Sequence, residues 1–190
     1  MPYTKQGTNF LYDDVSGDII GVKDSDSGEM YFARDPRIGV FVSMQDQTDG
    51  SPGTPMEFDT TVISRGITLV GNDTIRVDRK AIYNWQLSVQ IQNSDSQAHS
   101  FDLWGKRNGT AIPSSNFSYS VPSSHGGSPG RLVPSQNFYL TLEAGDEIQV
   151  LWYTDNANVT IQHVDPQTSP DRPATPSIIL TVNEVSSLFI

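Results

Sequence analysis

Apolar and polar residues alternate with a period of two along most of the chain. The pattern is clearest at 137–153 (NFYLTLEAGDEIQVLWY), where two alternating runs flank a turn at 143–146. Successive side chains of a β-strand point to opposite faces, and Gly145 tolerates the positive φ that a tight turn requires. This stretch therefore predicts two antiparallel strands joined by a turn.

The second of these strands is apolar on both faces. Val150 and Trp152 share one face, while Leu151 and Tyr153 share the other with Gln149. A strand that has its core on one side and water on the other is normally polar on its outer face. We therefore expect the second face to lie in a contact between subunits, with coverage by another part of the same chain as the alternative.

Short strands separated by turn residues recur from residue 37 onward. The expected strands are 39–45, 56–58, 62–63, 68–70, 74–77, 81–93, 99–107, 116–121, 132–142, 147–153, 158–163 and 177–185. No segment carries apolar residues at the 3.6-residue spacing of a capped amphipathic helix. About ten strands at short spacing predict an all-β, antiparallel sandwich or barrel.

Residues 1–36 differ in composition from the remainder. We expect them to form a separate anchoring segment ahead of a domain at 37–190. Strand candidates at 18–23 and 29–33 flank an acidic turn and predict a β-hairpin. A two-stranded hairpin alone is marginally stable in water. We therefore expect it to dock onto its own domain, a sister subunit or a larger assembly. The anchoring candidates are its apolar side chains: Phe10, Leu11, Ile19, Ile20, Met30, Tyr31 and Phe32.

Composition narrows the classes of partner. The chain has 190 residues, a net charge of −10 and no cysteine. The negative charge disfavours nucleic acid as a partner, and the lack of thiols excludes disulfides and thiolate metal sites. No stretch approaches the roughly 20 apolar residues of a membrane helix, and the first ten residues do not read as a signal peptide. We expect a soluble protein without membrane insertion.

The strand expected at 81–93 separates an apolar face from a neutral polar one. Tyr83 and Trp85 lie on the apolar face, and Gln86 and Gln90 lie on the other, which carries no charge. A solvated face would usually include Lys or Glu. Uncharged amides favour a hydrogen-bonded contact between subunits, with a polar face beneath a loop as the alternative.

Three pieces of the chain resemble one family: 80–92 (KAIYNWQLSVQIQ), 137–152 and 176–185 (PSIILTVNEV). In order and spacing they resemble the complement/tumour-necrosis-factor-like jelly roll, over roughly 38–186. The resemblance implies ten strands in two sheets, and a homotrimer whose inner sheets meet on the threefold axis. It leaves open which face of each strand points to the axis. The trimer-interface candidates are Tyr83, Trp85, Gln86, Gln90, Gln149, Leu151, Tyr153 and Ile179.

Further pieces resemble virion proteins of tailed bacteriophages: 10–33, 41–48 (FVSMQDQT) and 103–116 (LWGKRNGTAIPSSN). This resemblance implies a structural protein on the capsid or tail surface, of the head-decoration, knob or head-fibre type. Its N-terminal segment would attach it to the major capsid protein or to another virion protein.

Candidate chemistry is sparse. Asp24, Asp26 and Glu29 resemble half of a calcium loop, and the same residues make a good hairpin turn. The histidines, which lack metal-type spacing, are His99, His125 and His163. The C-terminal carboxylates, which form no recognisable acid/base pair, are Asp165, Asp171 and Glu184. We expect no catalytic, metal or cofactor site and no enzyme, with a polysaccharide hydrolase as the last alternative.

The first alternative to a head-decoration protein is a tail fibre or tail appendage that binds host-surface glycans. The loops at 47–55 and 123–130 would make the contact. Trp104, Tyr119 and Tyr153 are aromatic residues that could stack on sugars, although core packing is the favoured role for Trp104 and Tyr153.

Overall fold

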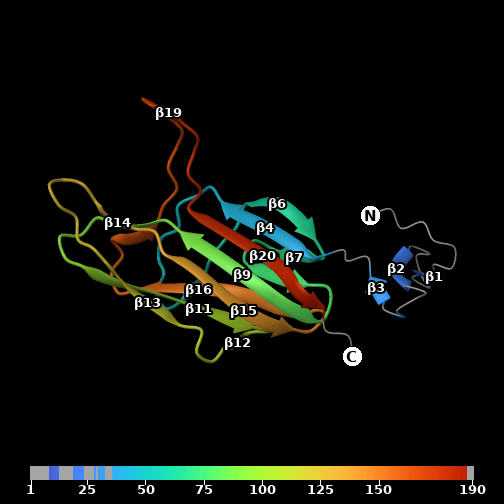
Figure 1. Cartoon of the computed structure of the whole chain (residues 1–190). Helices are drawn as coiled ribbons and strands as arrows, with labels where there is room; N and C mark the ends of the chain where they lie inside the picture. The colour runs from blue at the N-terminus through green and yellow to red at the C-terminus, as the bar shows by residue number, and fades with distance from the viewer. Residues whose placement is uncertain (1–8, 13–18, 24–27, 29, 33–35, 188–190) are drawn as a thin grey trace. The chain divides into compact units, whose positions relative to one another are not determined.

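The computed structural model describes residues 9–12, 19–23, 28, 30–32 and 36–187 (Figure 1). The chain divides into two compact units, Met1–Pro36 and Arg37–Ile190. Throughout the described ranges the regular elements are all strands, which confirms the all-β prediction. No helix there is long and apolar enough to cross a membrane.

The first unit is a three-stranded antiparallel sheet in the order β1-β2-β3. Its strands are β1 (Asn9–Tyr12), β2 (Ile19–Lys23) and β3 (Met30–Phe32). The predicted hairpin corresponds to β2 and β3, and β1 is a strand that the sequence pattern did not predict. The seven anchoring candidates belong to these strands, but their side chains lie outside the described part of the chain, as do Asp24, Asp26 and Glu29. The anchoring and calcium interpretations stay predictions.

The second unit is a sandwich of two antiparallel layers (Figure 1). One layer has the order β15-β9-β20-β4-β6, formed by β15 (Ser135–Leu142), β9 (Ala81–Val89), β20 (Ile178–Ser187), β4 (Ile38–Ser43) and β6 (Thr60–Arg65). The other has the order β12-β11-β16-β8-β7, formed by β12 (Thr110–Ala111), β11 (His99–Arg107), β16 (Glu147–Thr154), β8 (Thr74–Val77) and β7 (Ile67–Val70). In this second layer β13 (Phe117–Val121) pairs with β11, and β5 (Thr54–Pro55) pairs with β16.

Smaller pieces complete the unit. A short sheet runs β14-β10-β17, from β14 (Gly130–Leu132), β10 (Ile91–Asn93) and β17 (Val159–Ile161). A hairpin of β18 (Gln167–Thr168) and β19 (Asp171–Arg172) projects from the body of the sandwich (Figure 1).

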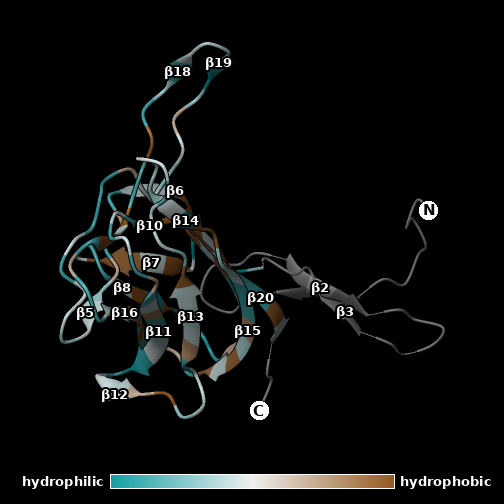
Figure 2. Cartoon of the chain, turned by 90° about the vertical axis from the view of Figure 1, so that its left-hand side faces the viewer, coloured by the Kyte–Doolittle hydropathy of each residue, from teal (hydrophilic) through white to brown (hydrophobic). Residues whose placement is uncertain are grey.

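The core lies between the two layers and follows from the alternation along the strands (Figure 2). On β9, Tyr83, Trp85 and Leu87 all point inward and are buried. Trp85 stacks on Phe138 with ring centroids 6.1 Å apart. Buried aromatic rings dominate such cores because each removes a large apolar area from water. The aromatic face predicted for 81–93 is therefore a core face.

Two turns have the backbone that their residues favour. Asn108 and Gly109 have φ of 51° and 81°, the two positive values of a type I′ hairpin turn between β11 and β12. Gly145 has φ of 87° between β15 and β16. The turn predicted at 143–146 is confirmed, and Asn-Gly is the residue pair that a type I′ turn favours.

Candidate interaction surface on the open sheet

The five-stranded sheet has one side on the core, and no further layer formed by residues 36–187 covers its other side. We call this second side the open face and define it by cross-strand pairing. Asn84 of β9 lies opposite Tyr139 of β15 and Asn183 of β20. Gln86 lies opposite Thr181 in the same way. The residues that β4, β9, β15 and β20 present on the open face are Ile38, Val40, Val42, Ile82, Asn84, Gln86, Ser88, Ser135, Asn137, Tyr139, Thr141, Ile179, Thr181, Asn183 and Ser186, and Val185 stands at the irregularity before Ser186.

Exposed apolar side chains gather on this sheet. Among the described residues, six large apolar side chains are exposed, and five of them belong to β6, β15 or β20. These five are Val62, Ile63, Tyr139, Ile179 and Val185, with exposed fractions of 39–62%. Single exposed apolar residues are ordinary, whereas a cluster on one face of a sheet is typical of an interaction site.

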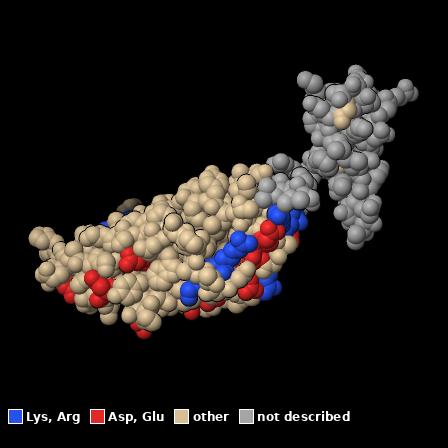
Figure 3. Space-filling view, turned by 90° about the horizontal axis from the view of Figure 1, so that it is seen from below, with Lys and Arg blue, Asp and Glu red and all other residues tan. Residues whose placement is uncertain are grey.

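The open face also carries little charge. None of the residues that β4, β9, β15 and β20 contribute to it is Lys, Arg, Asp or Glu, and β6 adds one charge at its end, Arg65, which lies opposite Ile38. On the underside of the molecule, Figure 3 shows charged side chains gathered mainly in one band, with broad areas that carry neither sign. Protein interfaces are depleted of charge at their centre, so the open face fits a contact between protein surfaces.

The outer strand β6 adds to this surface. All six of its residues, Thr60–Arg65, are exposed, and within the described strands β6 pairs only with β4. Ile63 lies opposite Val40 on the open face, and Val62 stands where the pairing shifts register. An exposed edge strand with apolar side chains is a ready site for contact with another chain.

The structure places the eight predicted interface residues in different parts of the sandwich. Gln86 and Ile179 lie on the open face. The prediction of a subunit contact is wrong for Tyr83 and Trp85. Both side chains are 0% exposed in the core and leave no surface for another subunit. Gln90 is half-buried between β9 and β10, where its N–H donates to the carbonyl of Ser177 at 2.8 Å.

Gln149, Leu151 and Tyr153 lie on β16, in the opposite layer of the sandwich. Leu151 is only 2% exposed, so its assignment to a subunit contact is a second correction. Its cross-strand neighbour is Trp104, and a Cβ added at Gly53 would lie 2.7 Å from the Trp104 ring. The loop at 47–55 therefore lies against this side of the layer, and coverage within the chain is the correct alternative for Leu151.

Two of the aromatic residues considered for sugar stacking, Tyr119 and Trp104, make packing contacts within the protein. Tyr119 packs against the core, and its hydroxyl is hydrogen-bonded to the Gln136 amide on β15. Burial raises the pKa of the Tyr119 phenol. Trp104 has Gly53 against its ring. These contacts favour packing roles for both residues.

Two of the carboxylates considered for a hydrolase, Glu184 and Asp165, lie far apart. The Glu184 side chain is 4% exposed and pairs with Arg79 near the end of β20. Asp165 lies at the base of the β18–β19 hairpin, beyond the start of the same strand. Six strand residues alone span roughly 20 Å, about twice the largest carboxyl separation used by glycosidases. Among the described residues, no group of three His, Asp or Glu side chains is arranged to hold a metal ion.

No protein-family model matches this sequence, and no curated protein matches it either. A crystal structure of murine APRIL at pH 5.0 matches the fold with a TM-score of 0.53. The match covers 80% of this chain and 100% of that chain, at 16% sequence identity. The fold is a tumour-necrosis-factor-like jelly roll. The predicted jelly roll is thereby confirmed, whereas the homotrimer, the virion location and the partners stay predictions.

Proposed function

We propose that the protein is a homotrimeric structural protein of a tailed-phage particle, of the head-decoration, knob or head-fibre type. The jelly roll trimerises through the open face. Residues 1–36 attach the trimer to the major capsid protein or to another virion protein. The observation that carries the trimer is the clustering of exposed apolar side chains on a sheet face to which β4, β9, β15 and β20 contribute no charge. The virion assignment rests on the resemblance of 10–33, 41–48 and 103–116 to phage virion proteins.

Association is favoured by removing this apolar area from water, at roughly 25 cal/mol per Å² before the entropic cost of ordering. The amides of Asn84 and Gln86 contribute hydrogen-bonding groups without the desolvation cost of a charge. A contact of this composition depends little on salt, because charge screening has few unit charges to act on there.

Trimerisation also suits attachment. Three copies of a weak anchoring segment, held together by the jelly rolls, bind a shell with threefold or quasi-threefold symmetry more tightly than one copy does. The mechanism is adhesion, and it requires no reacting group.

Sedimentation of the full chain at micromolar concentration tests the oligomer. We expect a trimer, and a stable, folded single copy would overturn the proposal. Immunogold labelling of purified particles from the source of the gene tests the virion assignment separately. Label on heads or tails supports the virion assignment. If the protein is a trimer but no label is found on particles, the trimer stands and the virion role is wrong.

Deletion of residues 1–36 tests the anchoring role. We expect a folded trimer that no longer binds particles, because the jelly roll and its open face lie in 37–190. Continued binding of the truncated trimer to particles would show that attachment resides in the jelly roll.

A further inference from the structure

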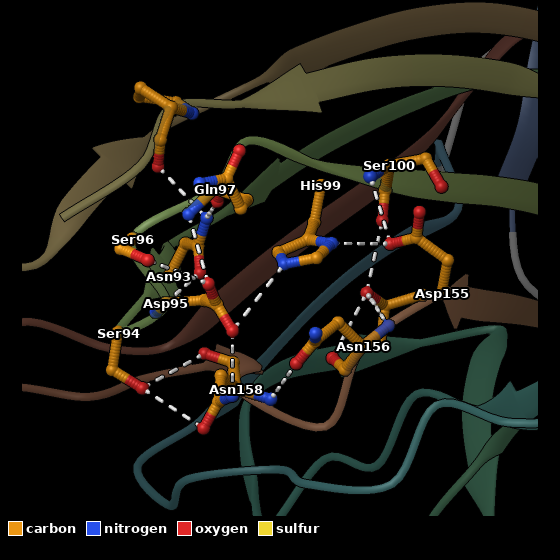
Figure 4. Close-up of polar contacts among 12 residues, drawn as sticks. Asn93, Ser94, Asp95, Ser96, Gln97, His99, Ser100, Asp155, Asn156 and Asn158 are labelled. Atoms are coloured by element: carbon orange, nitrogen blue, oxygen red, sulfur yellow. Dashed lines mark hydrogen bonds and ion pairs between the residues drawn. The ribbon is translucent and has the colours of Figure 1, made fainter.

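Two histidines each lie between two aspartates contributed by different loops. The first is His99, whose side chain is only 15% exposed at the start of β11. Its Nδ1 lies 3.3 Å from Asp155 Oδ1, and its Nε2 lies 3.7 Å from Asp95 Oδ2 (Figure 4). Asp95 belongs to the β10–β11 connection and Asp155 to the β16–β17 connection. The ring of His99 therefore bridges two loops.

Backbone and amide donors hold both carboxylates in place. Asp95 accepts the Gln97 N–H at 2.9 Å and the Asn158 side-chain amide at 3.2 Å. The Gln97 bond, the largest influence, lowers the pKa of Asp95 against the opposing effect of burial, with help from His99 and Asn158. Asp155 accepts the Ser100 N–H at 3.1 Å. The two carboxylates are thus positioned as acceptors before the imidazole takes up a proton.

The second histidine is His163, just after β17. Its Nδ1 lies 3.1 Å from Asp46 Oδ1 and its Nε2 lies 3.3 Å from Asp165 Oδ1. The His163 N–H also donates to Asp46 Oδ1 at 2.8 Å. Asp46 belongs to the β4–β5 connection, and Asp165 lies at the base of the β18–β19 hairpin, beside the Val164–Thr175 bridge. Hydrogen bonds of the ring to the carboxylates of Asp46 and then Asp165 raise the pKa of His163.

The number of protons on the ring makes the His163 arrangement sensitive to pH. A neutral imidazole has one N–H donor and one bare nitrogen, whereas an ionised carboxylate only accepts. A neutral ring therefore satisfies one of its two aspartates, and a protonated ring satisfies both. Loss of the proton leaves a nitrogen lone pair facing a carboxylate oxygen.

We propose that His163 is a proton-operated clasp that fastens the β4–β5 connection to the base of the β18–β19 hairpin, just after β17. Among the described residues, the charged groups that face its ring are Asp46 and Asp165. For His163 the sign follows from its raised pKa. The added stability is fully present below the ordinary histidine value of about 6.5 and is lost as pH rises through the folded value.

A metal site is a poorer interpretation of these residues. The two nitrogens of each ring face different carboxylates on different sides of the imidazole, so the ligands do not converge on one point. Within the described ranges, no three such side chains converge on a point that could hold a metal ion.

Amide hydrogen exchange of the full chain by NMR tests the clasp. The His163 N–H reports on Asp46. After correction for intrinsic exchange, we expect this amide to be roughly two- to fivefold better protected at about pH 5.5 than at about pH 8. Equal protection at the two pH values would overturn the proposal.

Matched variants assign the effect. His163→Gln should abolish the pH-dependent gain at the amide of residue 163, and His99→Gln should leave that gain in place. His125→Gln is a second control, because His125 is exposed in the 123–130 loop. Persistence of the gain in His163→Gln would overturn the proposal. If His163→Gln does not fold, Asp46→Asn keeps an acceptor oxygen, removes the charge and carries the same expectation.

Discussion

Asn108 Nδ2 donates to Asp146 Oδ1 at 2.7 Å and thereby joins two turns that lie 38 positions apart in the sequence. The return contact is the Glu147 N–H, which donates to Asn108 Oδ1 at 2.9 Å. Asp146 Oδ2 accepts the Glu143 N–H at 2.7 Å and also pairs with Arg107. The turn at 143–146 is therefore a connection between the two hairpins as well as a reversal of the chain.

The ionisation of Asp146 should couple this connection to pH. Burial alone would raise the pKa of Asp146, but hydrogen bonds from Glu143, Asn108 and Arg107 outweigh it and the pKa is lowered. A lowered carboxyl pKa gives stability that is present above the ordinary value of about 3.9 and is lost as pH falls through the folded value.

We expect Asp146→Asn to lower the free energy of unfolding by about 2–3 kcal/mol at neutral pH, and by less in acid. Urea denaturation at a series of pH values measures the difference. Asp171→Asn, in the exposed β18–β19 hairpin, is the control and should change little. The same loss in acid as at neutral pH would show that the charge of Asp146 is unimportant.

The period-two alternation was sufficient to predict the all-β class and most strands, because side-chain direction depends only on the local backbone. The expected strand at 132–142 is divided into β14 and β15 at Val133 and Pro134. Pro134 has no N–H to donate to a ladder, and this local signal was present in the sequence. The short strand β1 (NFLY) lacks clear alternation, so its pairing with β2 was not predictable from pattern alone.

Which face of each strand points to the core was harder to predict than the positions of the strands. Phe138 and Tyr139 are adjacent aromatics on β15, and sequence gives either one to the core. Pairing decides the question: Phe138 lies opposite Trp85, and Tyr139 lies opposite Asn84. Coverage of Leu151 depends on a loop about 100 residues earlier in the chain, and the contact of His163 with Asp46 spans 117 positions. Such contacts leave no periodic signal.

Tyr83 should make the protein sensitive to alkaline pH. Its hydroxyl donates to the carbonyl of Arg79 at 2.9 Å. Burial, followed by Glu184 and Asp78, raises the pKa of Tyr83 to about 12. A raised folded value means that stability is fully present below about pH 10 and is lost as pH rises toward 12.

We expect Tyr83→Phe to lower stability by about 1 kcal/mol near neutral pH and to flatten the alkaline decline. Thermal unfolding followed by circular dichroism between about pH 9 and 12 measures both effects. Tyr139→Phe, at a ring that is 62% exposed, is the control and should retain the wild-type decline. An unchanged slope in Tyr83→Phe would assign the alkaline transition to other groups.

Glu184 should contribute more to stability than the surface ion pairs do. Its carboxylate, 4% exposed, accepts from Arg79 Nε at 3.1 Å and from the Arg37 N–H at 3.1 Å. Removing one partner of a buried pair leaves the other uncompensated, so Glu184→Gln should cost about 2–4 kcal/mol. Glu143→Gln breaks the exposed pair with Lys80 and should cost at most about 1 kcal/mol. Equal losses in denaturant titrations would contradict this ranking.

A charge placed on the open face should separate the subunits without unfolding them. Ile179 is 39% exposed on β20, so Ile179→Glu leaves the core intact and keeps the carboxylate solvated in a single copy. In the proposed trimer the same carboxylate would be buried without a cation, at a cost of several kcal/mol per copy.

We therefore expect Ile179→Glu to sediment as a monomer at micromolar concentration with an unchanged far-ultraviolet circular dichroism spectrum. Val133→Glu is the matched control, because Val133 is 52% exposed outside the strands of the five-stranded sheet. It introduces the same charge at a similarly exposed apolar position and should remain trimeric. Dissociation of both variants would point to a general effect of added negative charge, and dissociation of neither would place the subunit contact away from the open face.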